Sequence, residues 1–562
     1  MSGRADLYNG KAMSTTSENP NSGAGYEPTL NSGHWADISA EKVIRERGPS
    51  GSDKKQFTCA SGITPSGVIH IGNFREIISV DLVVRALRER GEPVRFLYSW
   101  DDYDVFRKVP QSVPNAAEFE RYLRWPITLV PDPAGVEESY ARANEVELEG
   151  LLSLVGIEPE YIYQAQRYRA SAYAEGIRTA LAAREKIRAL LNEHRTQPLP
   201  DDWWPVSVFS GFTNKDTTTI LDWDGEWGLS YSCDESGKSE TVDLRTTSLV
   251  KLPWRIDWPM RWQHEQVDFE PAGKDHHSEG GSFDTARGVS EQIYGWKAPV
   301  TFQYDFISIK GRGGKISSSS GDVVSLRDVL EVYEPEVVRY LFAGTRPNSE
   351  FAISFDMDVV KIYEDYDRCE RVYYGVDEMS EKKKAKERRI YELSQVHNPA
   401  SEAPFQVAFR HLCSLVQIAD FNHERALEMA RIEAGHAALS EADRARLLRR
   451  AACAERWLAE FAPEDFRFRM KTAEAELIEV SSSETAAIRG LAELLQKDWD
   501  TLTDKSLAEE LYRVSRDAGV EPKDFFVVMY RVLIGKEKGP RLAAFIRTVG
   551  RERVLALLER YI

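Results

Sequence analysis

Residues 64–73 constrain the fold of this chain more than any other segment, and they read TPSGVIHIGN. The strand-like residues 56–60 precede them, and from His70 to Arg90 the apolar residues recur at helical spacing. Gly91 is suited to end that helix, and the strand-like run VRFLY at residues 94–98 follows. This strand–helix–strand order predicts an α/β fold with a parallel, Rossmann-like sheet.

The start of this helix is suited to binding phosphate. Free N–H groups and the positive end of the helix dipole attract anions there. His70 and Asn73 lie in the first turn, where both can donate hydrogen bonds to phosphate oxygens. Neighbouring residues supply hydroxyl donors or, as glycines, allow close backbone approach: these are Thr64, Ser66, Gly67 and Gly72.

A second motif lies far downstream, where residues 311–320 read GRGGKISSSS. Lys315 is suited to neutralise the other end of a triphosphate, and Ser317, Ser318 and Ser319 offer further donors. Neither motif is specific alone, because a histidine at a helix start is usually a polar cap and serine runs are usually loops. Their order and separation together favour nucleotidyl transfer at the α-phosphate of ATP.

Composition narrows the class of protein. A chain of 562 residues implies several domains, and 42% hydrophobic with 29% charged residues is typical of a soluble globular protein. No run of about 18 apolar residues occurs, so no membrane span is expected. The net charge of −17 argues against unspecific nucleic-acid binding, though not against a specific nucleic-acid partner. Five scattered cysteines predict a reducing, cytoplasmic location.

Shifts in pattern predict six regions. Residues 1–33 are polar and form an expected disordered extension. Residues 34–197 and 253–324 form the two halves of the Rossmann-like domain, separated by a β-rich insert at residues 198–252. Residues 325–400 and 401–562 are predicted to be helical.

These motifs resemble those of the class I aminoacyl-tRNA synthetases. Residues 64–73 are similar to the first signature of that class, with asparagine in the last place, and residues 315–319 to the second, with serine for its second lysine. Further segments resemble class I lysyl-tRNA synthetases in particular: residues 99–110, 251–259, 273–276, 280–285 and 535–541. The resemblance extends from about residue 34 to residue 562.

The resemblance implies a two-step reaction. ATP, with Mg²⁺, would activate L-lysine to lysyl-adenylate, and the lysyl group would pass to the 3′ end of tRNA(Lys). The helical C-terminus would bind the anticodon region, and a monomer is favoured. Gly273, Asp275 and His276 would hold the ribose or adenosyl moiety.

The resemblance and the chemistry of an ammonium ligand also imply a lysine pocket. A carboxylate or a stacked aromatic ring must face the ε-ammonium. The candidates are Gly62, Thr64, Asp101, Asp102, Trp254, Asp257 and Trp258. The sequence leaves open which carboxylate contacts the ammonium.

The insert departs from the family pattern. In related archaeal-type enzymes it resembles a zinc ribbon with two Cys-x-x-Cys pairs, whereas the matching positions here read Ser207-x-x-Ser210 and Cys233-x-x-Ser236. A four-coordinate structural zinc needs its full set of ligands. We therefore expect no zinc in this chain.

Three alternatives remain at this point. The chain is a class I synthetase for glutamate, glutamine or arginine, or a tRNA-binding regulatory paralogue with weakened catalysis, or a nucleotidyltransferase that makes a dinucleotide cofactor. The serine at position 318 and the altered insert motivate the paralogue.

Overall fold

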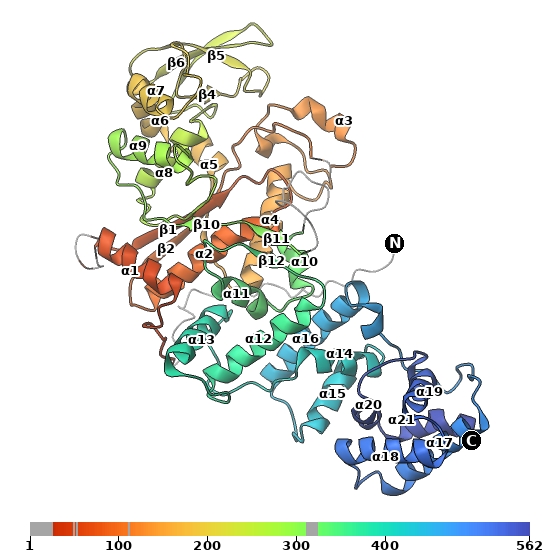
Figure 1. Ribbon diagram of the computed structural model, residues 1–562. Coiled ribbons are helices and arrows are strands. Elements are labelled where there is room, and N and C mark those ends of the chain that lie inside the picture. Colours follow the sequence, from red (N-terminus) through yellow and green to blue (C-terminus); the bar gives the residue numbers. More distant parts are fainter. Residues whose placement is uncertain (1–25, 49–50, 52–53, 111–112, 311–323) are drawn as a thin grey trace.

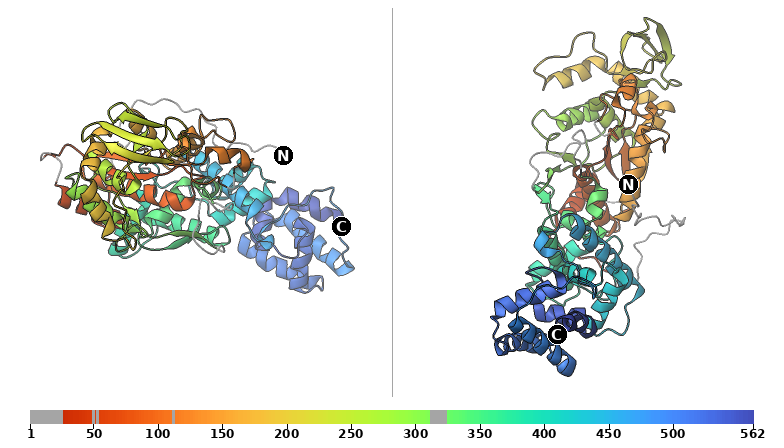
Figure 2. Two further views of the ribbon diagram at one scale, coloured as in Figure 1. Left: turned by 90° about the horizontal axis from the view of Figure 1, so that it is seen from above. Right: turned by 90° about the vertical axis from the view of Figure 1, so that its right-hand side faces the viewer.

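The computed structural model describes residues 26–48, 51, 54–110, 113–310 and 324–562. The molecule is elongated (Figures 1 and 2): an α/β body occupies the middle, with the β-rich insert at one end and the helical C-terminal part at the other. Lys315, Ser317, Ser318 and Ser319 fall outside the described residues. None of the described helices has the length and apolar character of a membrane span.

The central sheet is parallel, as predicted. Strand β1 (Phe57–Ile63) pairs with β2 (Val94–Trp100), and β2 pairs with β3 (Glu160–Tyr163). Single parallel bridges from Cys59 to Phe269 and from Phe269 to Val300 extend the sheet on the other side of β1. Strands β9 (Ala272–Gly273) and β10 (Gln303–Tyr304) continue these segments. The carboxyl ends of β1, β2 and β9 therefore lie at one edge, where ligands of open α/β sheets bind.

Helix α2 (Ile71–Arg88) connects β1 to β2 and is buried along most of its length. It is covered on several sides because it contacts α1 (Trp35–Arg47), the sheet and α11 (Pro335–Ala343). The guanidinium of Arg75 on α2 donates to the carbonyls of Phe306, Arg346 and Pro347. This buried arginine fixes two loops beside the start of the helix.

The sequence pattern does not predict two of the short strands. Residues 144–189 show two stretches of helical spacing interrupted near Gly156 and Pro159, and the interruption contains β3, whose four residues are too few to show alternation. The strand-like run at residues 301–309 is divided into β10 and β11 (Ile307–Ile309). Strand β11 pairs with β12 (Phe351–Ile353), which lies in a region expected to be helical.

The insert is built from antiparallel strands. Strand β6 (Gly228–Cys233) pairs with β5 (Thr218–Trp223) and β7 (Ser239–Asp243), and β4 (Ser207–Val208) pairs with β8 (Val250–Lys251). Trp203, Trp204, Trp223 and Trp227 pack against the hydrophobic core that joins the insert to the body. Ser207 lies on β4 opposite Lys251, whereas Ser210, the other matching position, follows the end of that strand.

Helices make up most of the rest of the described chain. Those of the body and insert are α3 (Ala116–Phe119), α4 (Tyr140–Leu154), α5 (Gln164–Arg169), α6 (Ala174–Ala182), α7 (Arg184–Asn192), α8 (Trp254–His264) and α9 (Ser282–Gln292). The C-terminal part contains α10 (Leu326–Leu330), α11, α12 (Asp358–Tyr373), α13 (Glu381–Ser394), α14 (Phe409–Ile418), α15 (His423–Glu433), α16 (Glu441–Glu460), α17 (Ser482–Asp498), α18 (Asp504–Asp517), α19 (Pro522–Ile534), α20 (Leu542–Val549) and α21 (Arg551–Leu558). Helices α17–α21 have a hydrophobic core of their own.

Candidate active site

Two cavities meet at the carboxyl end of β1. The first, here called the helix cavity, opens at the start of α2 and is lined by His70, Asn73, Gly273 and Asp275 among others. The second, the indole cavity, lies beside α8 and is lined by tryptophan side chains. Ser61, Gly62, Glu76 and His276 line both cavities. A ligand in one cavity therefore lies next to a ligand in the other.

The helix cavity unites residues that the sequence places far apart. His70 is the N-cap residue of α2, and the Ile71 N–H donates to the carbonyl of Val324 at 2.9 Å, where the described chain resumes. A Cβ at Gly72 would lie 2.8 Å from Nδ1 of His70. A residue without a side chain at position 72 therefore leaves room for the imidazole in this position. Oδ1 of Asn73 is buried and receives no hydrogen bond from the described residues.

Some candidate residues lie outside both linings. The Thr64 hydroxyl donates to Asp104 at 2.9 Å, and Asp104 pairs with Lys251 at 2.7 Å. The Ser66 carbonyl accepts a hydrogen bond from the Tyr140 hydroxyl. Gly67 is buried in the same turn and, like Thr64 and Ser66, does not line the helix cavity. In this structure these residues shape the turn before α2.

Tryptophans of α8 form one wall of the indole cavity. The rings of Trp254 and Trp258 are stacked with centroids 4.9 Å apart, and Trp262 lies 4.8 Å beyond Trp258. Their spacing of four residues places the three rings on one face of the helix. His276, whose Nδ1 lies 2.6 Å from the Ser282 hydroxyl, contacts the ring of Trp254.

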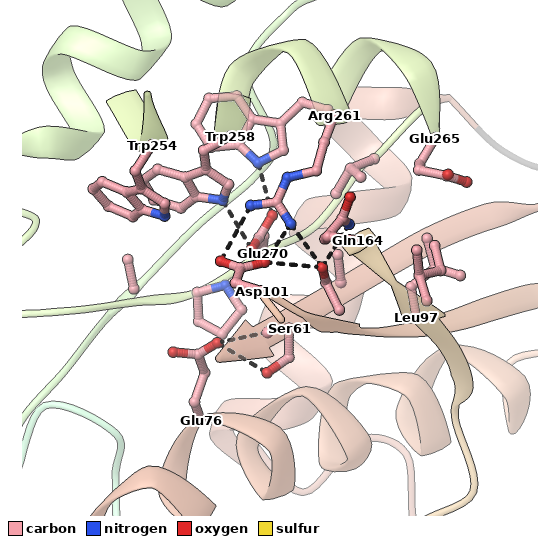
Figure 3. A pocket seen from close by; sticks show the side chains of 18 of the residues that line it. Ser61, Glu76, Leu97, Asp101, Gln164, Trp254, Trp258, Arg261, Glu265 and Glu270 are labelled. Carbon is pink, nitrogen blue, oxygen red and sulfur yellow. Dashed lines mark hydrogen bonds and ion pairs between the residues drawn. The ribbon is translucent and has the colours of Figure 1, made fainter. Parts of the chain in front are cut away.

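Glu270 lies against these indoles. Its oxygens accept hydrogen bonds from Nε1 of Trp258 at 3.0 Å and from Nε1 of Trp262 at 2.7 Å (Figure 3). The side chain is buried and forms no ion pair within the described parts of the chain. Burial raises the pKa of Glu270 to about 7, and the nearby charge of Glu76 adds to the rise, whereas the indole donors oppose it.

Glu76 stands between the two cavities. It lies on α2 one turn after Asn73 and accepts hydrogen bonds from the Ser61 hydroxyl at 2.9 Å and the Gly62 N–H at 3.2 Å. The hydroxyl of Tyr304 also donates to it. Burial raises the pKa of Glu76, although these three donors favour the carboxylate.

The aspartates named from the sequence are mostly occupied by other partners. Arg261 on α8 pairs with Asp101 at 2.6 Å and with Asp257 at 3.0 Å. Asp101 lines the indole cavity, whereas Asp257 lies outside it and accepts a hydrogen bond from Tyr168. Asp102 accepts the N–H of Ala165 at 2.7 Å and faces a different polar cavity. Among the described residues, the cavity therefore offers Glu76 and Glu270 as carboxylates without an arginine partner.

Sequence reasoning missed five residues that line the two cavities. They are Glu76, Arg261, Trp262, Glu270 and Tyr304. Two signals pointed to them: Glu76 shares a helix face with Asn73, and Trp262 continues the four-residue spacing of Trp254 and Trp258. Glu270 carries no local signal, because its position depends on how the segment before β9 docks beside β1.

A model of the family "tRNA synthetases class I (K)" matches residues 33–397. A lysine–tRNA ligase of Borreliella burgdorferi is 52% identical over 95% of this chain and 100% of its own length. The corresponding ligase of Treponema pallidum is 52% identical over 94% of this chain and 98% of its own length. That of Pyrococcus horikoshii is 40% identical over 94% and 99%.

Solved structures give more distant matches. A glutamate–tRNA ligase of Elizabethkingia meningosepticum is 14% identical, with a TM-score of 0.41, over 90% of this chain and 99% of its own. A methionyl-tRNA synthetase of Mycobacterium tuberculosis is also 14% identical, with a TM-score of 0.33, over 71% and 89%. The family model and the full-length relatives agree with the signatures at the start of α2: this chain belongs to the class I tRNA synthetases of the lysine family.

Proposed function

We propose that this protein is a lysine–tRNA ligase that activates L-lysine with ATP and transfers it to the 3′ end of tRNA(Lys). Full-length relatives with this activity in their names support the assignment. The observation that carries it is Glu270, a buried carboxylate that accepts hydrogen bonds from two indoles of a three-tryptophan wall and has no arginine partner in the described chain. Such a site is suited to an ammonium group, because rings and carboxylate both attract a cation.

The two-cavity geometry suggests how lysine binds. We place the ε-ammonium at Glu270, deep in the indole cavity, and the α-carboxylate at the wall shared with the helix cavity. The α-ammonium is bonded to the same carbon as the carboxylate, so Glu76 in the shared wall is its nearest acceptor. Asp101, already paired with Arg261, is the remaining candidate among the predicted aspartates that line the cavity.

ATP would occupy the helix cavity. His70 and Asn73 would donate hydrogen bonds to the phosphates at the start of α2, and Gly273, Asp275 and His276 would contact the nucleoside. The lysine carboxylate would then attack the α-phosphorus, and pyrophosphate would leave. The roles of Lys315, Ser317, Ser318 and Ser319 on the leaving group stay predictions.

Mg²⁺ would enter with the triphosphate, since the described residues contain no cluster of three or more histidine, cysteine or carboxylate side chains placed to hold a metal. The tRNA would reach the shared wall with its 3′ end, while the helical C-terminal part would contact the anticodon region. We favour a monomer in the cytoplasm for this function.

Pyrophosphate exchange tests the assignment directly. Lysine should support exchange with ATP, measured with and without tRNA, whereas glutamate, glutamine and arginine should not. The substitution His70→Ala should reduce the rate of lysine-dependent exchange about 10²–10³-fold, which is the typical effect of removing one preorganised donor. His411→Ala removes a half-exposed histidine paired with Glu433 and serves as the control. Exchange that depends on glutamate and not on lysine would refute the proposal.

A further inference from the structure

Two turns of the insert, residues 210–215 and 233–238, share one backbone pattern. In each turn the first residue donates its N–H to the carbonyl of the sixth at 2.8 Å. The carbonyl of the first residue accepts the N–H of the fifth, also at 2.8 Å. The fifth residue is in the left-handed region in both turns, Asn214 with φ 60° and Gly237 with φ 67°. The two turns are therefore two copies of one local structure.

Side chains at the first and fourth positions of both turns converge. Oγ1 of Thr213 lies 3.7 Å from Sγ of Cys233, and the side chains of Ser210 and Ser236 are close enough to influence the pKa of this thiol. These contacts, with that of Ser210 the largest, lower the pKa of the Cys233 thiol to about 6. The N–H of the sixth residue donates to the fourth side chain in each turn, at 3.4 Å to Thr213 and 3.3 Å to Ser236.

Two pairs of side chains, each spaced by two residues and supplied by two such turns that meet, match the ligand spacing of a structural zinc site. The residues here do not fit zinc, because three of the four are hydroxyls and only Cys233 supplies a sulfur. Both turns nevertheless keep the backbone hydrogen bonds described above. Ser207, which the sequence offered as a ligand equivalent, belongs to β4 and not to either turn.

We propose that the hydrogen-bonded cluster of Ser210, Thr213, Cys233 and Ser236 takes the place of a metal ion and holds the insert together without one. The three hydroxyl side chains lie around the sulfur of Cys233, so the contacts that a cation would make to four ligands are made among the side chains themselves. The insert then keeps a geometry into which a metal site can be rebuilt by changing three side chains.

A variant with Ser210→Cys, Thr213→Cys and Ser236→Cys tests the geometry in the full-length protein. It should bind one Co²⁺ per chain with the absorption of a tetrahedral tetrathiolate, and Zn²⁺ should displace the Co²⁺. The matched control carries Ser207→Cys, Ser210→Cys and Ser236→Cys, and therefore has the same number of thiols. The control should not give the tetrathiolate spectrum, because position 207 lies on β4.

The wild-type protein supplies the second measurement. It should contain no stoichiometric zinc after purification, and a chelator should leave its thermal midpoint unchanged, whereas removal of metal should lower the midpoint of the rebuilt variant. Cys233→Ser should keep more of the wild-type midpoint than Cys233→Ala, because serine preserves a hydrogen-bonding group at the centre. Zinc bound stoichiometrically to the wild type, a tetrathiolate formed by the control set alone, or equal midpoints of the two Cys233 variants would overturn the proposal.

Discussion

At the scale of single residues, the charge of Glu270 is the feature on which lysine recognition depends. Glu270→Gln keeps the size of the side chain and an oxygen that can accept from one indole, but removes the negative charge. A hydrogen bond to a charged group contributes about 1.5–3 kcal/mol, so KM for lysine should rise about ten- to hundredfold while KM for ATP changes little. Lysine-dependent pyrophosphate exchange measures both constants.

Glu265→Gln is the matched control for this substitution. Glu265 lines the same cavity, but its carboxylate pairs with Arg95 at 2.8 Å. Its loss should leave KM for lysine nearly unchanged. Equal effects of the two substitutions would mean that the general negative potential of the cavity, and not contact with Glu270, selects lysine.

The same residue predicts a dependence on pH. Burial raises the pKa of Glu270 to about 7, so the carboxylate that binds an ammonium is lost as the pH falls through 7. The kcat/KM for lysine reports groups of the free enzyme and should fall about tenfold per pH unit below that point. The Glu270→Gln variant should lack this limb of the profile. A wild-type profile that stays flat from pH 8 to about pH 5.5 would contradict the assignment.

At the scale of elements, Arg261 joins helix α8 to the end of β2. It is buried and pairs with both Asp101 and Asp257. Burial raises the pKa of Asp257, and the charge of Arg261 opposes that rise. Arg261→Met would leave the buried Asp257 and the partly buried Asp101 without their cation, which costs about 3–5 kcal/mol of the free energy of unfolding. Denaturant unfolding followed by tryptophan fluorescence measures this loss.

Arg287→Met provides the comparison on the neighbouring helix α9. Arg287 pairs with Asp284 at 2.9 Å, but both side chains are well exposed, at 50% and 36%. An exposed pair contributes about 0–1 kcal/mol, so this variant should unfold close to the wild type. If both variants lose the same small amount, the buried arginine does not hold α8 in place.

The helices and strands differ in how well the sequence predicts them. The turn at residues 64–73 and α2 were predictable because apolar spacing and the glycine at position 91 are local signals. Strands β3 and β12 were not, because three or four residues carry too little alternation and are fixed by their neighbours in the sheet.

Within the site, the sequence identified an acid-rich, tryptophan-rich pocket but not the acid that stays unpaired. The proximity of Arg261 to Asp257 follows from helical spacing, since the two are four residues apart. Its contact with Asp101 depends on how α8 docks on β2, which no local pattern encodes. The same is true of Glu270 and its indole donors.

At the scale of the whole molecule, the described chain has separate hydrophobic cores. One extends from the sheet through helices α10–α16, and another is formed within α17–α21. Cores that share few side chains can unfold in separate steps, so two-state unfolding is not expected. Tyr98 and Ile307 of the helix cavity belong to the first core, whereas Trp258 and Trp262 of the indole cavity belong to a smaller cluster beside it. The end of the helical part that we assign to anticodon contact belongs to the second core.

Calorimetry of the full-length protein should therefore resolve more than one transition. Leu491→Ala on α17 should lower the transition temperature of the C-terminal helices. Creating a cavity in that core costs about 2–5 kcal/mol of the free energy of unfolding. Leu82→Ala on α2, equally buried, should lower the other transition. Lysine with ATP should raise only the transition that Leu82→Ala lowers, since ligands stabilise the unit that binds them. A single transition that both substitutions shift equally would show that the two cores unfold as one.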